Sequence, residues 1–412
     1  MRNNHFIVLA VVAFLFAQVG FAAASEPPAR ANWTIMVFIN ADNNLDVCGI
    51  EDIQEMERAG VARGVNVIVE IDRLGLPARR YSVGEKVSGS PEDDWGLKSK
   101  KLAELGEIDM GDYNELVSFA GWSIEKYPAE NYMLIVWNHG DGWRKKASGA
   151  EAASPLRGIS YDDQSKNHIT TKQLGLAMSA IRSIAGRPLD ILGMDACLMQ
   201  MMEVAYEVRE NVRFICASEE TEPADGWPYE LVLTPLYKNP AMDAADLAKL
   251  VPQAYFQFYL NGGGNDSTTQ SAIDCSRLND LAGAIDELAA VLVEAIPLDA
   301  DVRHALDFAV SNAQKYYYRD HLDIGDLFWF IRENTKNGKV IQACQKALMV
   351  YRKTVMVSRS TGDSMKDSTG MTIYFPKKDF NPAYSDLKFS SGPWDEMVNL
   401  FQASGRPLSC RR

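Results

Sequence analysis

Two side chains that can carry nucleophilic chemistry each follow a short apolar run in the first half of the chain. The run at 132–137 leads into His139, and the run at 189–194 leads into Cys197. If these runs are neighbouring parallel strands, their carboxyl ends meet at one edge of the sheet, where functional groups collect. We therefore expect the imidazole and the thiol to lie together, although they are far apart in the chain.

A cysteine and a histidine at one sheet edge can perform covalent catalysis. A thiol with an ordinary pKa of about 8.5 is mostly protonated at neutral pH, so a neighbouring imidazole must accept its proton. The same imidazole then protonates a leaving amine. The attack creates an oxyanion that needs backbone N–H donors. We expect these donors to be the amides of Gly140 and Cys197, because glycine has no side chain to obstruct its amide.

The alternative is a structural role for both residues. A cysteine after an apolar strand is often a packing residue, and a histidine at a strand end often serves only as a hydrogen-bonded loop residue. Spacing alone does not decide between these two interpretations.

Other chemistries lack their motifs in this sequence. It contains no H-E-x-x-H, G-x-S-x-G, Walker A or G-x-G-x-x-G signature, so zinc, serine-hydrolase, P-loop and dinucleotide sites are not predicted. The six cysteines include no C-x-x-C pair, which disfavours a zinc ribbon or a redox motif. We expect at least half of them to be small buried hydrophobic residues.

The charge balance disfavours general nucleic-acid binding. Lys and Arg number 42 against 55 Asp and Glu, which gives a formal net charge of -13. Phosphate binding requires concentrated positive charge, so a cationic partner suits this chain better.

The order of elements predicts an α/β fold. Of the 412 residues, 47% are hydrophobic, which allows a large buried core. Near-continuous apolar runs are typical of strands buried on both faces of a parallel sheet. Five such runs lie at 33–39, 65–71, 132–137, 189–194 and 212–217. Helical patterns separate some of these runs, at 50–59, 114–126 and 171–184, and Thr170 with Gln173 forms a capping-box pattern before the last of them. A shorter strand pair is expected within 80–87.

The second half of the chain is expected to be more helical. Helical spacing covers 245–260, 278–296, 302–318, 324–333 and 340–357, and two further strands are expected at 269–274 and 371–375. We expect a mainly parallel sheet flanked by helices on both faces.

The first 24 residues are typical of an export signal. Arg2 precedes an apolar run at 6–16, and three alanines precede Ser25 at a typical cleavage site. The alternative is an uncleaved anchor, because the apolar character nearly reaches the length of a spanning helix. We expect residues 1–24 to be removed and residues 25–412 to form an exported domain, either secreted or periplasmic.

The segment at 144–157 reads as an exposed connector. It is rich in Ala, Ser and Gly, and it carries Lys145, Lys146 and Arg157 near its ends. Exposed connectors of this kind are preferred sites of proteolytic cleavage.

Hard oxygen ligands cluster after the first apolar run. Asp42, Asn43, Asn44 and Asp46 resemble part of a calcium loop, but an EF-hand loop would need glycine at the position of Val47. We favour turn formation and helix capping for this segment.

Together these motifs resemble the clostripain family of cysteine endopeptidases, which is related in fold to caspases, gingipains and legumains. The resemblance covers nearly the whole mature chain and is carried by WTIMVFINADNNLD, IVWNHGDGW, GMDACLM, ICASEETEPADGWPY, SAIDCSRL, DIGDLFWF and GMTIYFP. It implies a caspase-like fold, with His139 as the N-H-G histidine and Cys197 as the D-A-C nucleophile. The caspase signature Q-A-C-x-G is not matched, which argues against cleavage after Asp.

The resemblance also implies cleavage after Arg or Lys. An enclosed basic side chain requires a carboxylate partner. Asp195, two residues before Cys197, and Asp225 are the expected pocket residues. The competing interpretation of the Asp225 region is a solvated acidic loop, because Glu219, Glu220 and Glu222 lie nearby in sequence.

Maturation in this family further implies self-cleavage near Lys145, Lys146 or Arg157 in the 144–157 connector.

No cofactor is expected to be required; calcium dependence is described for some relatives, but the sequence places no site for it. The expected partners are protein or peptide substrates, without nucleic acid or stable membrane insertion. Two alternative functions are a catalytically silent secreted binding or adhesion protein of the same fold, and a metal- or redox-dependent protein.

Overall fold

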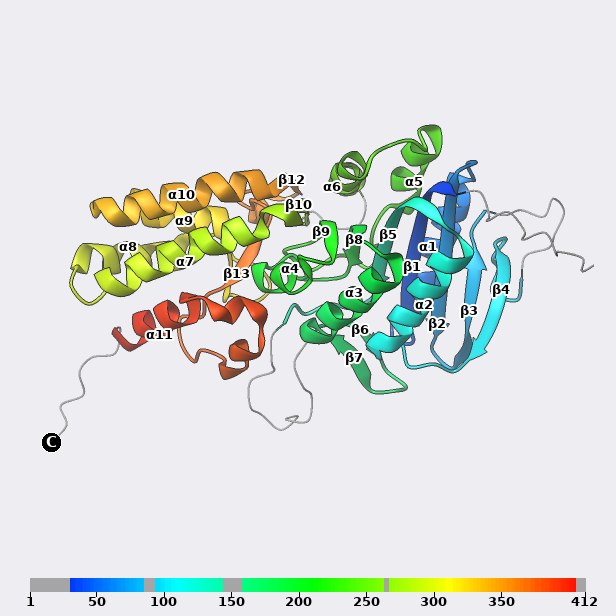
Figure 1. Cartoon of the computed structure of the whole chain (residues 1–412), viewed down its shortest axis with the longest axis horizontal. Coiled ribbons are helices and arrows are strands. Elements are labelled where there is room, and N and C mark those ends of the chain that lie inside the picture. Colours follow the sequence, from blue (N-terminus) through cyan, green and yellow to red (C-terminus); the bar gives the residue numbers. More distant parts are fainter. Residues whose placement is uncertain (1–29, 85–92, 144–157, 263–266, 405–412) are drawn as a thin grey trace, which may run out of the picture.

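The computed structural model describes residues 30–84, 93–143, 158–262 and 267–404 (Figure 1). The expected signal at 1–24 and the expected connector at 144–157, with Lys145, Lys146 and Arg157, lie outside the described residues. No helix in the described part of the chain is both long enough and apolar enough to cross a bilayer.

A nine-stranded sheet forms the centre of the molecule, in the order β12-β10-β9-β8-β5-β1-β2-β3-β4. Its middle consists of five parallel strands, and these are the five apolar runs. They are β1 (Ala31–Ala41), β2 (Val65–Arg73), β5 (Ala129–Trp137), β8 (Leu189–Asp195) and β9 (Val212–Ala217).

Antiparallel strands complete the sheet at both edges. On one side these are β3 (Leu76–Ser82) and β4 (Lys100–Gly106), and on the other β10 (Thr269–Asp274) and β12 (Val355–Ser360). Two small sheets pair β6 (Gly158–Asp162) with β7 (Asn167–Thr170), and β11 (His321–Asp323) with β13 (Thr372–Tyr374).

Helices cover both faces of the sheet because successive residues of a buried strand point to opposite faces. Met36 and Phe38 pack with one set of helices, while Ile35 and Val37 pack with the other. The first set includes α2 (Tyr113–Lys126), α3 (Thr171–Ala185) and α4 (Met202–Val208), and the second α1 (Asp46–Ala59), α5 (Tyr229–Lys238) and α6 (Ala244–Leu260). The expected capping box of Thr170 and Gln173 is formed at the start of α3.

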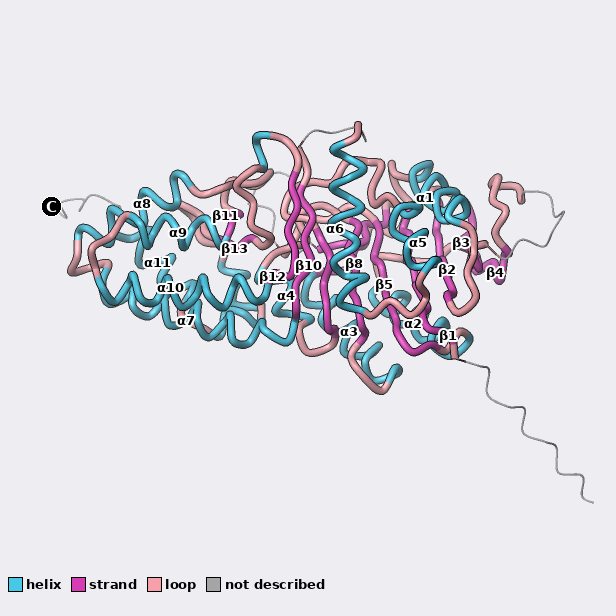
Figure 2. The backbone as a smooth tube through the Cα atoms, turned by 90° about the horizontal axis from the view of Figure 1, so that it is seen from above, coloured by secondary structure: helices cyan, strands magenta, loops and turns pink. Residues whose placement is uncertain are grey.

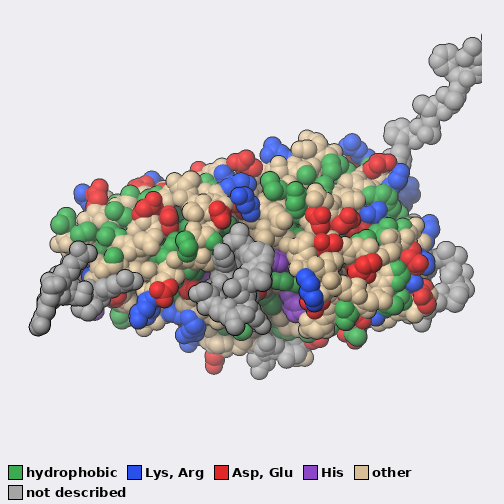
Figure 3. Space-filling model, turned by 90° about the horizontal axis from the view of Figure 1, so that it is seen from below, with side chains coloured by type: hydrophobic (Ala, Val, Ile, Leu, Met, Phe, Trp, Pro, Cys, Tyr) green, Lys and Arg blue, Asp and Glu red, His purple; other side chains and the backbone are tan. Residues whose placement is uncertain are grey.

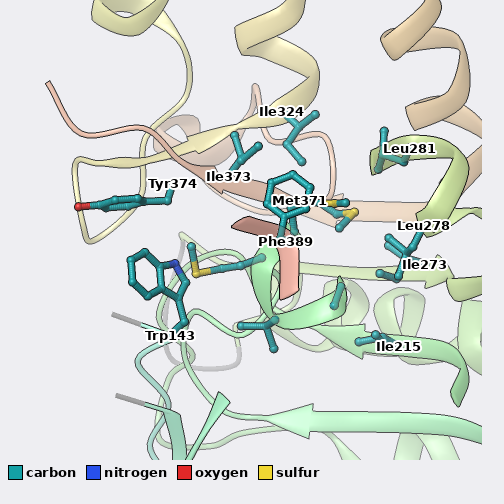
Figure 4. Close-up of a cluster of buried hydrophobic side chains, with 14 of the residues drawn as sticks. Trp143, Ile215, Ile273, Leu278, Leu281, Ile324, Met371, Ile373, Tyr374 and Phe389 are labelled. Carbon is teal, nitrogen blue, oxygen red and sulfur yellow. The ribbon is translucent and has the colours of Figure 1, made fainter. Parts of the chain in front are cut away.

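The C-terminal half adds a helical layer that lies beyond the β10–β12 side of the sheet (Figures 1 and 2). It contains α7 (Leu278–Ala295), α8 (Ala300–Asn312), α9 (Ile324–Glu333), α10 (Gly338–Thr354) and α11 (Trp394–Ser404). Its buried side chains are continuous with the core of the α2–α3–α4 face. Figure 4 shows this junction, where Trp143 lies near Tyr374.

Several element boundaries differ from the sequence prediction. The helix expected to end at residue 318 ends at Asn312, because the chain turns back and Lys315 pairs with Leu322. The helix expected at 340–357 ends at Thr354. The next residue, Val355, is β-branched and starts the extended strand β12. The strand pair expected within 80–87 is formed instead by β3, which ends at Ser82, and β4, which begins at Lys100. The segment between these two strands includes residues 85–92, which the structure does not describe.

Candidate active site

The two expected reactive residues lie at matching positions of adjacent strands. β5 and β8 pair in parallel, with Trp137 opposite Asp195. His139 and Cys197 are therefore each two residues beyond the last paired positions. Both side chains line one cavity of about 260 Å³. The structure thus brings together the imidazole and the thiol that the sequence placed at a shared sheet edge.

The turn that carries Cys197 is strained. Leu198, the next residue, has a φ of 64°, a left-handed conformation that costs a residue with a side chain roughly 1–2 kcal/mol. The surroundings hold it there, because the amide of Leu198 donates to the Glu220 carbonyl at 3.1 Å and its side chain is buried. The turn leaves the Cys197 side chain half-buried at the cavity.

Two glycines let the histidine loop approach the cysteine loop. A Cβ on Gly140 would lie 2.4 Å from the Cys197 carbonyl oxygen, and one on Gly142 would lie 2.6 Å from Met201 Sδ. Gly142 also has a φ of +64°. Trp143 then anchors the loop, since its ring packs edge-on against Tyr374 at a centroid distance of 4.9 Å (Figure 4). These contacts explain why N-H-G-D-G-W needs both small residues and one large one.

His139 contacts the loop after β1. Its Nε2 lies 2.8 Å from Asn44 Oδ1. Burial lowers the pKa of His139 below its ordinary value of 6.5, and the charge of Asp163 opposes that change. The imidazole is therefore neutral at neutral pH.

Cys197 receives a backbone donor. The amide of Glu222 donates to Sγ at 3.2 Å. Burial raises the pKa of the Cys197 thiol above its ordinary value, and the Glu222 amide reduces that rise because it stabilises the thiolate. At neutral pH the proton thus stays on sulfur in the resting site, next to a neutral base.

A buried acidic pair forms the wall of the same cavity. Asp195 and Glu222 both line it. Asp195 Oδ2 accepts from Tyr229 Oη at 2.8 Å and from the Trp227 amide at 3.2 Å, while Glu222 Oε1 accepts from Gln270 Nε2 at 2.9 Å. The position of Asp195 agrees with the sequence expectation that its side chain lies on the cysteine side of the strand.

The two carboxyl groups do not ionise together easily. Burial raises the pKa of Asp195 to about 6, and the hydrogen bonds that it receives limit the rise. Burial, followed by repulsion from Asp195, raises the pKa of Glu222 well above its ordinary value. Asp195 keeps the lower pKa of the two, so the negative charge of this wall lies mainly on Asp195.

Asp52 adds a third acidic group behind this pair. It lies on α1, where its Oδ2 accepts from Trp137 Nε1 at 2.6 Å. Burial and the charge of Asp195 raise its pKa well above its ordinary value. The cavity is therefore backed by acidic groups that a bound cation would stabilise.

The other expected pocket residue, Asp225, has an exposed side chain. Its neighbours Ala224 and Gly226 line the cavity, so Asp225 lies in the loop at the cavity's edge. The competing interpretation of this region as a solvated acidic loop holds for the exposed Asp225 side chain but not for its neighbours. Glu219 is fully buried and accepts from Tyr316 Oη and the Gly370 amide, and Glu220 is 7% exposed.

Two residues of this site were missed or assigned another role in the sequence analysis. Asn44 was expected in a turn and not beside His139, and Glu222 was named only in the competing interpretation of the Asp225 region as a solvated acidic loop. The remaining residues of the 42–46 segment do act in the turn: Asn43 Oδ1 accepts from the Leu45 amide at 2.8 Å, and Asp46 pairs with Arg73 at 2.8 Å. The start of α1 has no side-chain cap, since its N-cap residue is Leu45.

On the face drawn in Figure 3, Lys and Arg side chains are scattered among Asp and Glu and do not form a continuous basic stripe.

The described cysteines, which are Cys48, Cys197, Cys216, Cys275 and Cys344, are all free thiols.

Solved structures with this architecture define the class as the C11 cysteine protease fold. A secreted C11 cysteine protease from Bacteroides thetaiotaomicron, in complex with an irreversible peptide inhibitor, matches with a TM-score of 0.65 and 20% identity, over 89% of this chain and 100% of that one. An inactive zymogen C11 protease from Parabacteroides distasonis matches with a TM-score of 0.64 and 17% identity, over 90% of this chain and 99% of that one. At these identities the likeness shows the fold.

The chain belongs to the clostripain family of cysteine peptidases, whose family model matches residues 37–397. Clostripain from Hathewaya histolytica is 32% identical over 209 residues, which cover 43% of this chain and 36% of clostripain. The match therefore spans about a third of that relative's length.

Proposed function

We propose that this protein is an endopeptidase that cleaves after Arg or Lys, with Cys197 as nucleophile and His139 as base. The observation that carries the proposal is the shared cavity, which presents a thiol, an imidazole and a buried carboxylate within one enclosed volume. Family membership supports the reaction class. The alternative of a silent binding protein is less well supported, because a protein without turnover has no need to keep this pair at a cavity.

In the proposed reaction the Cys197 sulfur attacks the substrate carbonyl carbon and its proton passes to His139. An Nε2–H that donates to Asn44 Oδ1 leaves Nδ1 to receive that proton. The amides of Gly140 and Cys197 are the proposed oxyanion donors, and the imidazolium protonates the leaving amine as the C–N bond breaks. Water then attacks the thioester, which releases the acid and restores the thiol.

The acidic wall is the proposed specificity element. A guanidinium or ammonium group that enters the cavity would contact the Asp195 carboxylate, with the carboxyl group of Glu222 beside it. Asp225, in the loop at the cavity's edge, would add to the negative potential at the entrance. Cleavage after neutral or acidic residues would bury that carboxylate without a partner, which costs free energy.

A panel of short reporter peptides tests this function. Peptides that end in Arg, Lys, Asp or Leu before the reporter group are compared at equal concentration with the purified wild-type protein. We expect release from Arg or Lys peptides and essentially none from Asp or Leu peptides. Turnover of the Leu peptide that equals turnover of the basic peptides would contradict the acidic pocket.

We also propose that the protein cleaves itself in the 144–157 segment, at Lys145, Lys146 or Arg157. Amino-terminal sequencing and intact mass of wild type and Cys197→Ala check this. The expected result is a new amino terminus in this segment for wild type and an intact chain for Cys197→Ala. Two intact chains would contradict self-cleavage, and two equally cut chains would assign the cut to another protease.

We further propose export of the mature domain after removal of residues 1–24. The apolar run and the small residues before Ser25 support this, as does the description of a C11 relative as secreted.

A further inference from the structure

The segment between α8 and β11 borders the proposed nucleophile. β11 lies between the helical layer and the central sheet (Figure 2). Tyr316 and Met365 form a small buried cluster with Leu198, and the side chains of Cys197 and Tyr318 pack against this cluster. It is separate from the core of the α1–α5–α6 face, which surrounds the acidic wall. The wall and this segment therefore border Cys197 on different sides.

The same segment contacts the histidine loop. Tyr318 Oη donates to Asp141 Oδ1 at 2.6 Å, and Asp141 is two residues beyond His139. In the proposed reaction the His139 imidazolium protonates the leaving amine, so the part of the substrate that follows the cleaved bond begins at the histidine. These substrate residues would therefore pass Tyr318 and its neighbours.

Glu220 ties this segment to the turn that carries Cys197. Its carbonyl accepts from the Leu198 amide at 3.1 Å, and its side-chain Oε1 accepts from the Tyr317 amide at 3.2 Å. The Tyr317 side chain is 65% exposed, and its ring contacts the Tyr318 ring at a centroid distance of 5.0 Å. Two tyrosine rings are thus held at a fixed place beside the reacting groups.

A hollow of about 520 Å³ opens next to these tyrosines. Its charged lining residues are Lys315, Arg319 and Glu220. Glu220 is 7% exposed, and its Oε1 already accepts from the amides of Thr221 and Tyr317. The charge that the hollow offers to a ligand is therefore positive.

The cations of this hollow have no acidic partners. None of the ion pairs formed by the described residues includes Lys315, Arg319 or the nearby Lys377. Arg319 is exposed, and its side chain has no hydrogen-bond partner in the part of the chain that the structure describes. Arginine presents five N–H donors, so this side chain is available to a ligand.

Lys315 is held at the hollow by the end of α8. Its Nζ donates to the carbonyls of Ser311 and Ala313 at 2.9 Å each, which leaves one of its three N–H donors. Burial, followed by repulsion from Arg319 and Lys377, lowers the pKa of Lys315 to about 8. An anion in the hollow would relieve that repulsion.

We propose that this hollow is a substrate subsite for an acidic side chain, Asp or Glu, within the first three residues after the cleaved bond. Arg319 and Lys315 would bind the carboxylate, and Tyr317 and Tyr318 would contact the peptide between that residue and the bond. Three residues of extended chain span about 10 Å, which sets the number of positions considered. The inference rests on the proposed function, because the direction of the substrate follows from the role of His139.

The overall charge of the protein predicts the opposite preference. The formal net charge is -13, and the acidic wall lies on the other side of Cys197. An added acid in the substrate should therefore weaken binding unless a local cation receives it. A preference for an acidic residue would thus report the subsite and not the general field of the protein.

Internally quenched peptides test the subsite with the wild-type protein. Each peptide has Arg before the cleaved bond and alanine at the three following positions, one of which is replaced in turn by Glu, Gln or Lys. At one of these positions kcat/KM should be about 5-fold higher for Glu than for Gln, and lower for Lys than for Gln. The preference should weaken as the salt concentration rises, because the pair is exposed to solvent.

Variants of Arg319 assign the preference to the hollow. Arg319→Gln should bring the ratio of kcat/KM for Glu and Gln peptides to about 1. Arg319→Glu should reverse the preference, so that Lys is favoured over Gln, and a misfolded protein would not show this gain. The matched control Arg352→Gln removes an exposed arginine of α10 that does not line the hollow, and it should keep the wild-type preference.

A short Arg peptide with only a reporter group after the bond separates the subsite from the activity itself. Equal kcat/KM for Glu and Gln at all three positions, while this short peptide is still cleaved, would overturn the subsite and leave the proposed function standing. A Glu preference that persists in Arg319→Gln would overturn its assignment to this hollow. Failure to cleave any Arg peptide would overturn both the subsite and the proposed function.

Discussion

Replacement of Cys197 by alanine should reduce kcat on an Arg peptide by about 10⁴-fold or more, since it removes the atom that forms the acyl-enzyme. KM should change little, because this substitution leaves the proposed acidic specificity wall intact. Steady-state kinetics with a sensitive fluorogenic peptide measures both constants. His139→Ala should lose nearly as much, because a protonated thiol beside no base is a poor nucleophile.

The matched control is Cys48→Ala. Cys48 is the other half-buried thiol among the described cysteines, and it lies on α1 away from the cavity lining. We expect this variant to keep wild-type turnover. Normal turnover by Cys197→Ala, or loss of turnover by Cys48→Ala of the same size, would contradict the assignment of the nucleophile.

Replacement of Asp195 by asparagine should reduce kcat/KM for an Arg peptide strongly. Truncation of one partner of a buried charge pair typically costs about 2–5 kcal/mol, which is a loss of about 30- to 5,000-fold. The asparagine can still accept from Tyr229 and the Trp227 amide, so the pocket should keep its shape. A peptide with citrulline in place of Arg, which is neutral and nearly the same shape, should lose far less.

Glu222 determines how large the loss of kcat/KM in Asp195→Asn is within this range. In wild type its pKa is raised in part by the charge of Asp195, so Asp195→Asn allows Glu222 to ionise and to replace part of the lost charge. We expect Glu222→Gln alone to have a small effect and the double variant to approach the upper end of the range. Equal losses for Arg and citrulline peptides would contradict a role of Asp195 in charge recognition.

The same pair of peptides should separate two pH effects. The pKa of Asp195 is about 6, so its carboxylate is charged above that pH and becomes neutral below it. The preference for Arg over citrulline should therefore fall as the pH is lowered through 6, with the groups that face Asp195, namely Glu222, Tyr229, Asp52 and Glu55, adding to the titration. The acid limb that both peptides share should lie below 6.5, where His139 takes up its proton.

The parallel centre of the sheet and the position of the reactive pair were predictable from sequence because both follow from local patterns. Apolar runs that are buried on both faces mark parallel strands, and reactive residues placed two positions beyond paired strand ends must lie close together. Gly140 and Gly142 were visible as small residues, but the contacts that require them, with Cys197 and Met201, depend on the packing of the two loops.

Apart from Asp195, the buried acids could not be predicted, because a charged residue in an isolated sequence is normally expected in solvent. Asp52 lies on a helix whose spacing shows only that one face is apolar, and its bond to Trp137 arises when α1 packs on the sheet. Glu222 sits among acids that looked like a solvated loop.

Elements without a strong apolar period were also missed. β4 has mostly exposed or half-buried residues and is held as a strand by pairing with β3. α5 contains Pro235 within a short helix, which weakens its helical signal. In these segments tertiary contacts, and not local preference, decide the structure.

Covalent labelling tests whether Cys197 and His139 act together beside a pocket for a basic side chain. Wild-type protein is treated with an irreversible peptidyl ketone inhibitor that carries Arg next to the reactive group, and the modified residue is located by peptide mass spectrometry. We expect one adduct per chain, on Cys197, formed far more slowly in His139→Ala and with a citrulline inhibitor. An adduct on another residue, or equal labelling rates in all three cases, would contradict it.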